Sequence, residues 1–139
     1  QIQGDIPVDW KKLNTSIKGL VIGTSCTSIE SGAFAFCNAL TGSLTIPNSV
    51  TNIGSYAFGY CQNLTGSLII PDSVTSIGNS TFQNCAAITS VSILATTAPT
   101  IGSSAFQNMT SVSPAVIHVP AGATGYAASY DGLTVVYDL

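Results

Sequence analysis

The sequence predicts a strand-rich α/β repeat solenoid with short helical turns and a repeat of 24 residues. Four isoleucines recur at this spacing, and a phenylalanine follows each of them at one fixed offset. The isoleucines are Ile29, Ile53, Ile77 and Ile101, and the phenylalanines are Phe34, Phe58, Phe82 and Phe106. A fixed period of about 20–50 residues is typical of solenoids, in which each unit buries its apolar face only by stacking on its neighbours.

We therefore interpret residues 1–139 as a single repeat domain. A degenerate unit containing Leu20, Ile22 and Cys26 precedes the four recognisable ones. Because both ends of a stack need a cover, we assign residues 1–19 to an N-terminal cap, 20–120 to the partial unit and four repeats, and 121–139 to a C-terminal cap.

The composition excludes several classes of protein. With 45% hydrophobic and 6% charged residues, the chain is too apolar to be disordered. The longest apolar stretches, such as 20–22, fall far short of the 18 or more residues that a membrane-spanning helix needs. We expect no membrane-inserted segment. The chain starts without a methionine or a basic leader, so we expect a processed form or an excised segment.

We expect no nucleic-acid partner, because the chain has no arginine and its three lysines lie between Lys11 and Lys18, too few to neutralise a row of phosphates. A net charge of -3 from six scattered acids gives no strong field for steering charged partners. Recognition must therefore rely on neutral polar groups and aromatic rings.

Each unit contains one predicted strand and a corner. Leu44 and Ile46 alternate with Ser43 and Thr45, which is the period of a half-buried strand. The same alternation recurs in the next unit. Prolines follow the strands at Pro47, Pro71 and Pro120, where a type I turn is expected.

A short helical turn is expected after each key isoleucine. Ser31, Ser55, Asn79 and Ser103 stand two positions beyond these isoleucines, and all four are strong N-cap residues. We therefore expect helical turns over 32–36, 56–60, 80–84 and 104–108, with alanine and phenylalanine facing the core.

The third unit departs from the pattern without losing the period. It has one residue fewer between Ile88 and Val91 and one more between Ile93 and Ile101 than the unit before it has at the same places. The two changes cancel, so the inward-facing positions are constrained more strongly than the loop between them.

The two ends break the repeat. Pro7, Trp10, Leu13 and Ile17 are expected to form a short amphipathic helix that covers the first unit. At the other end we expect a helix near 124–129, a turn at Asp131-Gly132 and a strand over 134–137 as the closing cap.

The pattern IxxxAFxxCxxL, followed by a strand and IPxSVTxI, resembles the BspA-like (Treponema-type) leucine-rich repeat of bacterial surface proteins. The resemblance covers residues 20–120 and includes a family-like close in residues 95–100 and 119–122, although Met109 replaces the repeat cysteine in the last unit. It implies a right-handed leucine-rich-repeat superhelix, an extracellular, cell-surface location, and adhesion to host or neighbouring-cell components. Family members are not enzymes as a rule.

No catalytic, cofactor or metal site is expected. Cys37, Cys61 and Cys85 fall in one column, where a ladder of parallel side chains suits neither a tetrahedral metal site nor disulfides, so we interpret them as small buried hydrophobes. His118 with Asp131 or Asp138 and a serine is a conceivable triad. Since nothing in the sequence positions these groups, we expect His118 to be an exposed strand residue.

The candidate binding surfaces are the outward columns. One is the strand face, and the other is the rim formed by the turns, whose rings suit a protein or sugar partner. The strand face comprises Ser43, Thr45, Ser67, Ile69, Ser90, Ser92 and His118, and the rim comprises Phe36, Tyr56 and Tyr60.

Three functions remain open from the sequence. The leading one is a non-catalytic surface module that binds a host, neighbouring-cell or matrix protein. The alternatives are a structural spacer within a larger surface protein and a carbohydrate-binding module. We expect a monomer, while the low surface charge and exposed strand edges leave weak self-association open.

Overall fold

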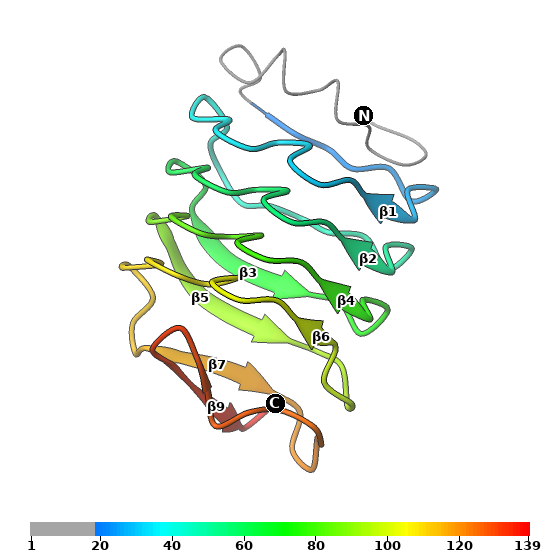
Figure 1. The fold of residues 1–139 in the computed structure, drawn as a ribbon, viewed down its shortest axis with the longest axis vertical. Coiled ribbons are helices and arrows are strands. Elements are labelled where there is room, and N and C mark those ends of the chain that lie inside the picture. The colour runs from blue at the N-terminus through cyan, green and yellow to red at the C-terminus, as the bar shows by residue number, and fades with distance from the viewer. Residues whose placement is uncertain (1–18) are drawn as a thin grey trace.

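A computed structural model describes residues 19–139, which form a β-solenoid whose coils stack along one axis (Figure 1). Two parallel stacks of strands run along the solenoid. The four-stranded sheet has the order β1 (Ser28–Ile29), β2 (Asn52–Ile53), β4 (Ser76–Ile77) and β6 (Thr100–Ile101). The five-stranded sheet has the order β3 (Gly66–Ile70), β5 (Ile88–Ile93), β7 (Val116–Val119), β9 (Leu133–Tyr137) and β8 (Ser129–Tyr130).

The strand register confirms the repeat and its compensated irregularity. In the four-stranded sheet Ser28, Asn52, Ser76 and Thr100 are successive partners, each 24 residues after the last. Between β3 and β5 the partner of Leu68 is Val91, and a bulge lies at the start of β3. The third coil is thus one residue shorter here and regains that residue before Thr100, as the sequence predicted.

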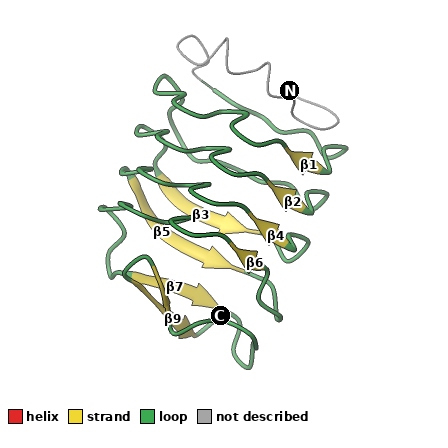
Figure 2. Cartoon of the chain, viewed as in Figure 1, coloured by secondary structure: helices red, strands yellow, loops and turns green. Residues whose placement is uncertain are grey.

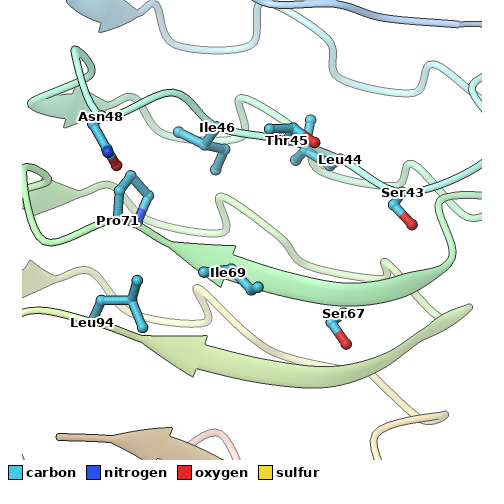
Figure 3. Close-up of a pocket in the computed structure, with 9 residues that line it drawn as sticks. All are labelled: Ser43, Leu44, Thr45, Ile46, Asn48, Ser67, Ile69, Pro71 and Leu94. Atoms are coloured by element: carbon cyan, nitrogen blue, oxygen red, sulfur yellow. The ribbon is translucent and has the colours of Figure 1, made fainter. Parts of the chain in front are cut away.

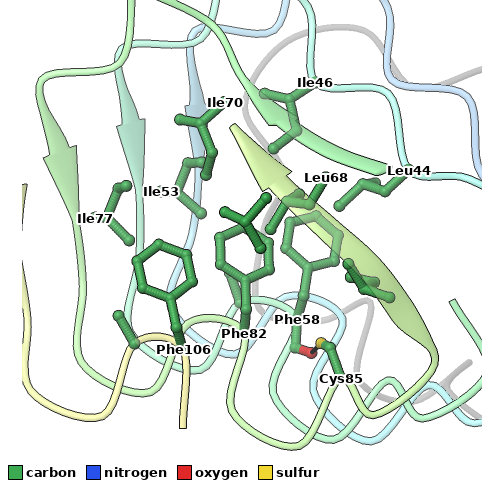
Figure 4. Packing of buried hydrophobic residues seen from close by; sticks show 14 of the residues in the cluster. Leu44, Ile46, Ile53, Phe58, Leu68, Ile70, Ile77, Phe82, Cys85 and Phe106 are labelled. Carbon is green, nitrogen blue, oxygen red and sulfur yellow. Dashed lines mark hydrogen bonds between the residues drawn. The ribbon is translucent and has the colours of Figure 1, made fainter. Parts of the chain in front are cut away.

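The core is a set of ladders running along the solenoid axis. The four key phenylalanines are at most 1% exposed, and consecutive ring centroids lie 5.4, 5.7 and 6.0 Å apart with nearly parallel planes. Figure 4 shows three of these rings beside the inward side chains of both sheets, including Ile53, Ile77 and Leu68. Because each ring packs on the ring of the next coil, no coil can bury its core alone.

The expected helical turns are wrong: residues 19–139 contain strands, turns and loops but no helix (Figure 2). The turn after β1 explains why. The Ala33 amide donates to the Glu30 carbonyl oxygen three residues back, whereas the Phe34 amide donates to Ala57 in the next coil at 2.8 Å. A helix would use every amide locally, but here alternate amides join the coils. The left-handed φ of 60° at Phe36 also ends any helical run.

The predicted N-cap residues serve the stack instead. The Ser55 hydroxyl oxygen accepts a hydrogen bond from the Asn79 amide at 3.1 Å, and Asn79 Oδ1 accepts one from the Ser103 amide at 2.9 Å. Their side chains do accept backbone N–H groups, as the sequence suggested, but the donor belongs to the following coil.

The C-terminal segment contains no helix near 124–129 either. The Thr124 amide donates to Thr96, and the Thr124 carbonyl oxygen accepts from Ala98, both at 2.9 Å. The backbone N–H and C=O groups of Thr124 are therefore both bonded to the loop of an earlier coil. Gly125 has a φ of 84°, which lies outside the helical range. A helix was therefore the wrong prediction for this stretch.

The turn and the final strand are confirmed. Asp131 and Gly132 both have positive φ, at 51° and 87°, and join β8 to β9 as an antiparallel pair. Strand β9 continues the parallel sheet beside β7. The amphipathic helix expected from Pro7 to Ile17 lies outside the described residues.

Candidate functional site

The strand face carries a shallow groove over the first and second coils, with one residue from the third. Alternation along β3 points Leu68 and Ile70 into the core and leaves Ser67 and Ile69 outside. Thr45 of the preceding coil pairs with Ile69 through an isolated bridge, which places these two outward-facing residues side by side. The groove has a volume of about 430 Å³. Its lining residues are Ser43, Leu44, Thr45, Ile46, Asn48, Ser67, Ile69, Pro71 and Leu94 (Figure 3).

The chemistry of the groove is apolar at its centre and polar at its margins. Ile69 is 48% exposed and Leu94 is 39% exposed, so two large aliphatic side chains face solvent next to each other. Ser43, Ser67 and Asn48 supply hydroxyl and amide groups around them (Figure 3). None of the lining residues is charged, so the groove suits a neutral, partly apolar ligand surface.

Four of the predicted strand-face residues line this groove, namely Ser43, Thr45, Ser67 and Ile69. The other predicted positions lie farther along the sheet. Ser90 is tied to the groove's margin because its hydroxyl donates to Ser67 Oγ at 2.7 Å.

Leu94 was missed by the sequence reasoning. It follows β5 directly, and its amide donates to the Ile70 carbonyl oxygen at 3.0 Å, which extends the parallel pairing by one residue. The signal was present, because an exposed-side leucine stands where the two preceding units have proline at Pro47 and Pro71.

His118 lies on strand β7 as expected, but it is half-buried rather than exposed. Its Nδ1 lies 2.8 Å from Asp138 Oδ1, and its side chain is only 28% exposed. Ser92 is the register partner of His118 on β5, but within residues 19–139 no hydrogen bond joins the two side chains. Asp131 is elsewhere, where it accepts from the Phe106 amide at 3.0 Å. The structure thus pairs His118 with Asp138 and leaves Asp131 out of the imagined triad.

The rim residues form a second surface. The Phe36 and Tyr60 rings stack with centroids 4.7 Å apart and planes 9° from parallel. Phe36 is 51% exposed and Tyr56 is 44% exposed, while Tyr60 is half-buried. None of the three lines the groove.

The cysteine column is confirmed as a set of buried free thiols. The Cys85 thiol donates to the Phe58 carbonyl oxygen at 3.1 Å (Figure 4), and Cys61 makes the equivalent bond to Phe34 at 3.0 Å. Burial raises the pKa of Cys37 to about 11 and that of Cys85 to about 12. Burial, with the neighbouring thiols, raises the pKa of Cys61 still further. These thiols stay protonated and unreactive in the folded protein.

Comparison with known proteins decides the family. The model of the BspA type leucine rich repeat region matches residues 13–124 in six copies. The chain belongs to the BspA-type leucine-rich repeat family. The family model divides residues 13–124 into six copies, one more than the four recognisable units and one partial unit that the spacing predicts.

A solved structure of the same type is similar to this BspA-type domain. It is a leucine rich cell surface protein from Faecalibacterium prausnitzii A2-165, with 28% sequence identity and a TM-score of 0.55. The similarity covers 83% of this chain and 35% of that protein, so this BspA-type domain corresponds to about a third of its relative. No curated protein sequence matches the chain.

The described part of the BspA-type domain has no helix long and apolar enough for a membrane span. It also brings together no group of three histidine, cysteine or acidic side chains that could hold a metal ion.

Proposed function

We propose that this domain is a non-catalytic binding module of a larger bacterial cell-surface protein, and that it holds a protein partner in the strand-face groove. The groove is the observation that carries the proposal, because six of its nine lining residues are exposed positions that the fold does not need for its core. Membership of the BspA-type family and similarity to a leucine rich cell surface protein support the cell-surface location.

A polypeptide is the ligand that the groove's chemistry favours. Ile69 and Leu94 are each about half exposed, so a partner's apolar side chain placed between them would bury the remaining surface of both. Serine and asparagine side chains at the margin can bond a partner's backbone N–H and C=O groups. Completing the burial of one such aliphatic side chain contributes about 1–1.5 kcal/mol, or roughly tenfold in affinity.

The proposal is tested by selecting ligands from a displayed random-peptide library and by measuring binding to immobilised matrix proteins. Ile69→Lys should weaken any selected ligand by about tenfold or more, because it places a charge in an apolar site. Thr110→Lys, which introduces the same charge at an exposed position outside the groove, is the matched control and should leave binding unchanged.

A folded monomer that selects no peptide and binds no matrix protein would refute the proposal and favour the spacer function. Equal effects of Ile69→Lys and Thr110→Lys would show that binding occurs away from the groove.

A further inference from the structure

The turns of the solenoid impose a left-handed backbone at two positions in every coil. The first is occupied by Gly32, Tyr56, Ser80 and Ser104, and the second by Phe36, Tyr60, Asn84 and Asn108. All eight residues have φ between 55° and 68°. Glycine and asparagine tolerate this conformation best, whereas a bulky side chain is strained in it.

Three aromatic residues stand at these positions in the first two complete units, although the backbone favours small ones. Their side chains are exposed or half-buried, so the core does not require them. The last two units meet the same backbone requirement with serine and asparagine. Aromatic side chains here therefore cost the fold stability, and strain of this kind tends to gather at binding sites.

Of the three aromatic residues, Tyr56 recovers the least of the stability that the left-handed backbone costs. Phe36 and Tyr60 recover part of it by stacking on each other at 4.7 Å. Tyr56 lies between Gly32 and Ser80 in its column, and it stacks on no aromatic ring within residues 19–139. Its ring instead lies close to Gly59: a Cβ atom added to residue 59 would be 3.1 Å from Cδ1 of Tyr56. No ring of a neighbouring coil covers Tyr56, and 44% of the residue faces solvent.

A ladder of amides continues the rim beyond the aromatic residues. Asn108 Nδ2 donates to Asn84 Oδ1 at 3.0 Å, and Gln83 Nε2 donates to Gln107 Oε1 at 2.8 Å. The Tyr60 amide donates to the Gln83 carbonyl oxygen at 2.7 Å, so the aromatic and amide parts lie on adjacent coils. A side-chain amide has two N–H groups and two lone pairs, so Asn84, Gln107 and Asn108 keep hydrogen-bonding capacity beyond the one bond to a neighbour. Gln83 Oε1 is buried and offers none to a ligand.

We propose that this aromatic rim, comprising Phe36, Tyr56, Tyr60 and the adjoining Asn84, binds a neutral carbohydrate. An exposed ring offers an apolar face to the C–H face of a sugar, and amides exchange hydrogen bonds with its hydroxyls. The turns at 31–38, 55–62, 79–86 and 103–109 contain no charged residue. Residues 19–139 contain no lysine or arginine, so this part of the chain offers anionic sugars no cationic side chain on the rim.

The test is a titration of the whole chain with neutral oligosaccharides of glucose, N-acetylglucosamine and mannose, and with sialyllactose and oligogalacturonate as anionic probes. Saturable binding of at least one neutral probe, with affinity at least tenfold above that for the anionic probes, is expected. Tyr56→Asn should abolish it or weaken it at least tenfold while leaving the thermal midpoint unchanged or higher, because asparagine suits the left-handed backbone.

Two variants keep the outcomes distinct. Ser104→Asn introduces the same residue at the equivalent position of the last unit and should leave sugar binding unchanged. Ile69→Lys should also leave it unchanged, since the rim and the groove share no residue. The inference is overturned if no neutral probe binds, if anionic probes bind equally well, or if Tyr56→Asn retains full affinity. Loss of a protein ligand alone in Tyr56→Asn would likewise assign the rim to a protein.

Discussion

Asp131 replaces a missing coil at the C-terminal end of the solenoid. In three units the phenylalanine amide donates to a carbonyl oxygen of the next coil, from Phe34, Phe58 and Phe82 at 2.8, 2.9 and 2.8 Å. Phe106 belongs to the last such unit, and its amide donates to Asp131 Oδ2 at 3.0 Å. The carboxylate thus satisfies an N–H group of a residue that is 1% exposed.

We predict that Asp131→Gly destabilises the protein by about 1–2 kcal/mol, the lower part of the range for leaving a buried N–H group without its acceptor, because Asp131 is itself exposed. Glycine isolates this effect, since residue 131 has a φ of 51° and an alanine would add backbone strain. Asp131→Asn keeps an acceptor oxygen and a residue suited to this φ, so it should cost less than about 1 kcal/mol.

Urea unfolding followed by circular dichroism measures the difference. With a slope of about 2 kcal/mol/M, the midpoint of Asp131→Gly should fall by roughly 0.5–1 M. Hydrogen exchange at the Phe106 amide gives a local check, because its protection should fall in Asp131→Gly and persist in Asp131→Asn. The exposed Asp72→Asn is the control for loss of a negative charge. The reasoning is refuted if Asp131→Gly and Asp72→Asn unfold at the same urea concentration.

Three further predictions follow from the stacked coils. The Cys85 thiol keeps its proton in the folded state up to about pH 12, whereas unfolded thiols ionise near the ordinary value of 9.0. The contribution of Cys85 to stability should therefore be complete below pH 9.0, and the free energy of unfolding should fall by up to about 1.4 kcal/mol per pH unit above it. Urea unfolding measured at several pH values in this range should show a shallower fall for Cys85→Ala. An equally steep fall in the variant and the parent protein would contradict the argument. Gly78→Ala should destabilise by more than about 2 kcal/mol, because its Cβ would collide with the Ser55 backbone nitrogen. Gly19→Ala, whose Cβ would have no atom of residues 19–139 within 4 Å, should be near neutral in the same assay. Phe82→Ala should cost about 3–5 kcal/mol in the same urea assay, since its ring stacks on rings in both adjacent coils, and a cost below 2 kcal/mol would mean that the ladder rearranges.

Much of the architecture could be predicted from the sequence because it depends on periodicity. The inward positions are fixed by burial, and a column of identical residues 24 apart can stack only if the coils are in register, as the phenylalanine ladder shows. The compensated change in the third coil was visible for the same reason. The outward columns on β3 also followed from simple alternation, so half of the groove was predictable from Ser67, Ile69 and their counterparts one coil earlier.

The prediction of helical turns was wrong because local helix propensity does not determine whether an amide donates within its own turn or to the next coil. Serine two positions after each isoleucine is a good N-cap, but each coil lies within hydrogen-bonding distance of the next. Alternate amides such as those of Phe34 and Phe36 therefore donate between coils at 2.8 Å. Nothing in a single unit of sequence records which of the two partners an amide takes.

The sequence by itself determined the repeat, the core columns and the family of this protein, because burial of periodic apolar side chains depends mainly on their spacing. Only the tertiary structure decided the contacts between residues remote in the chain. It placed Leu94 in the groove beside Ile69, Asp131 on the Phe106 amide and His118 beside Asp138. These contacts depend on where each coil and the closing segment come to rest, and that position results from the packing of the whole stack.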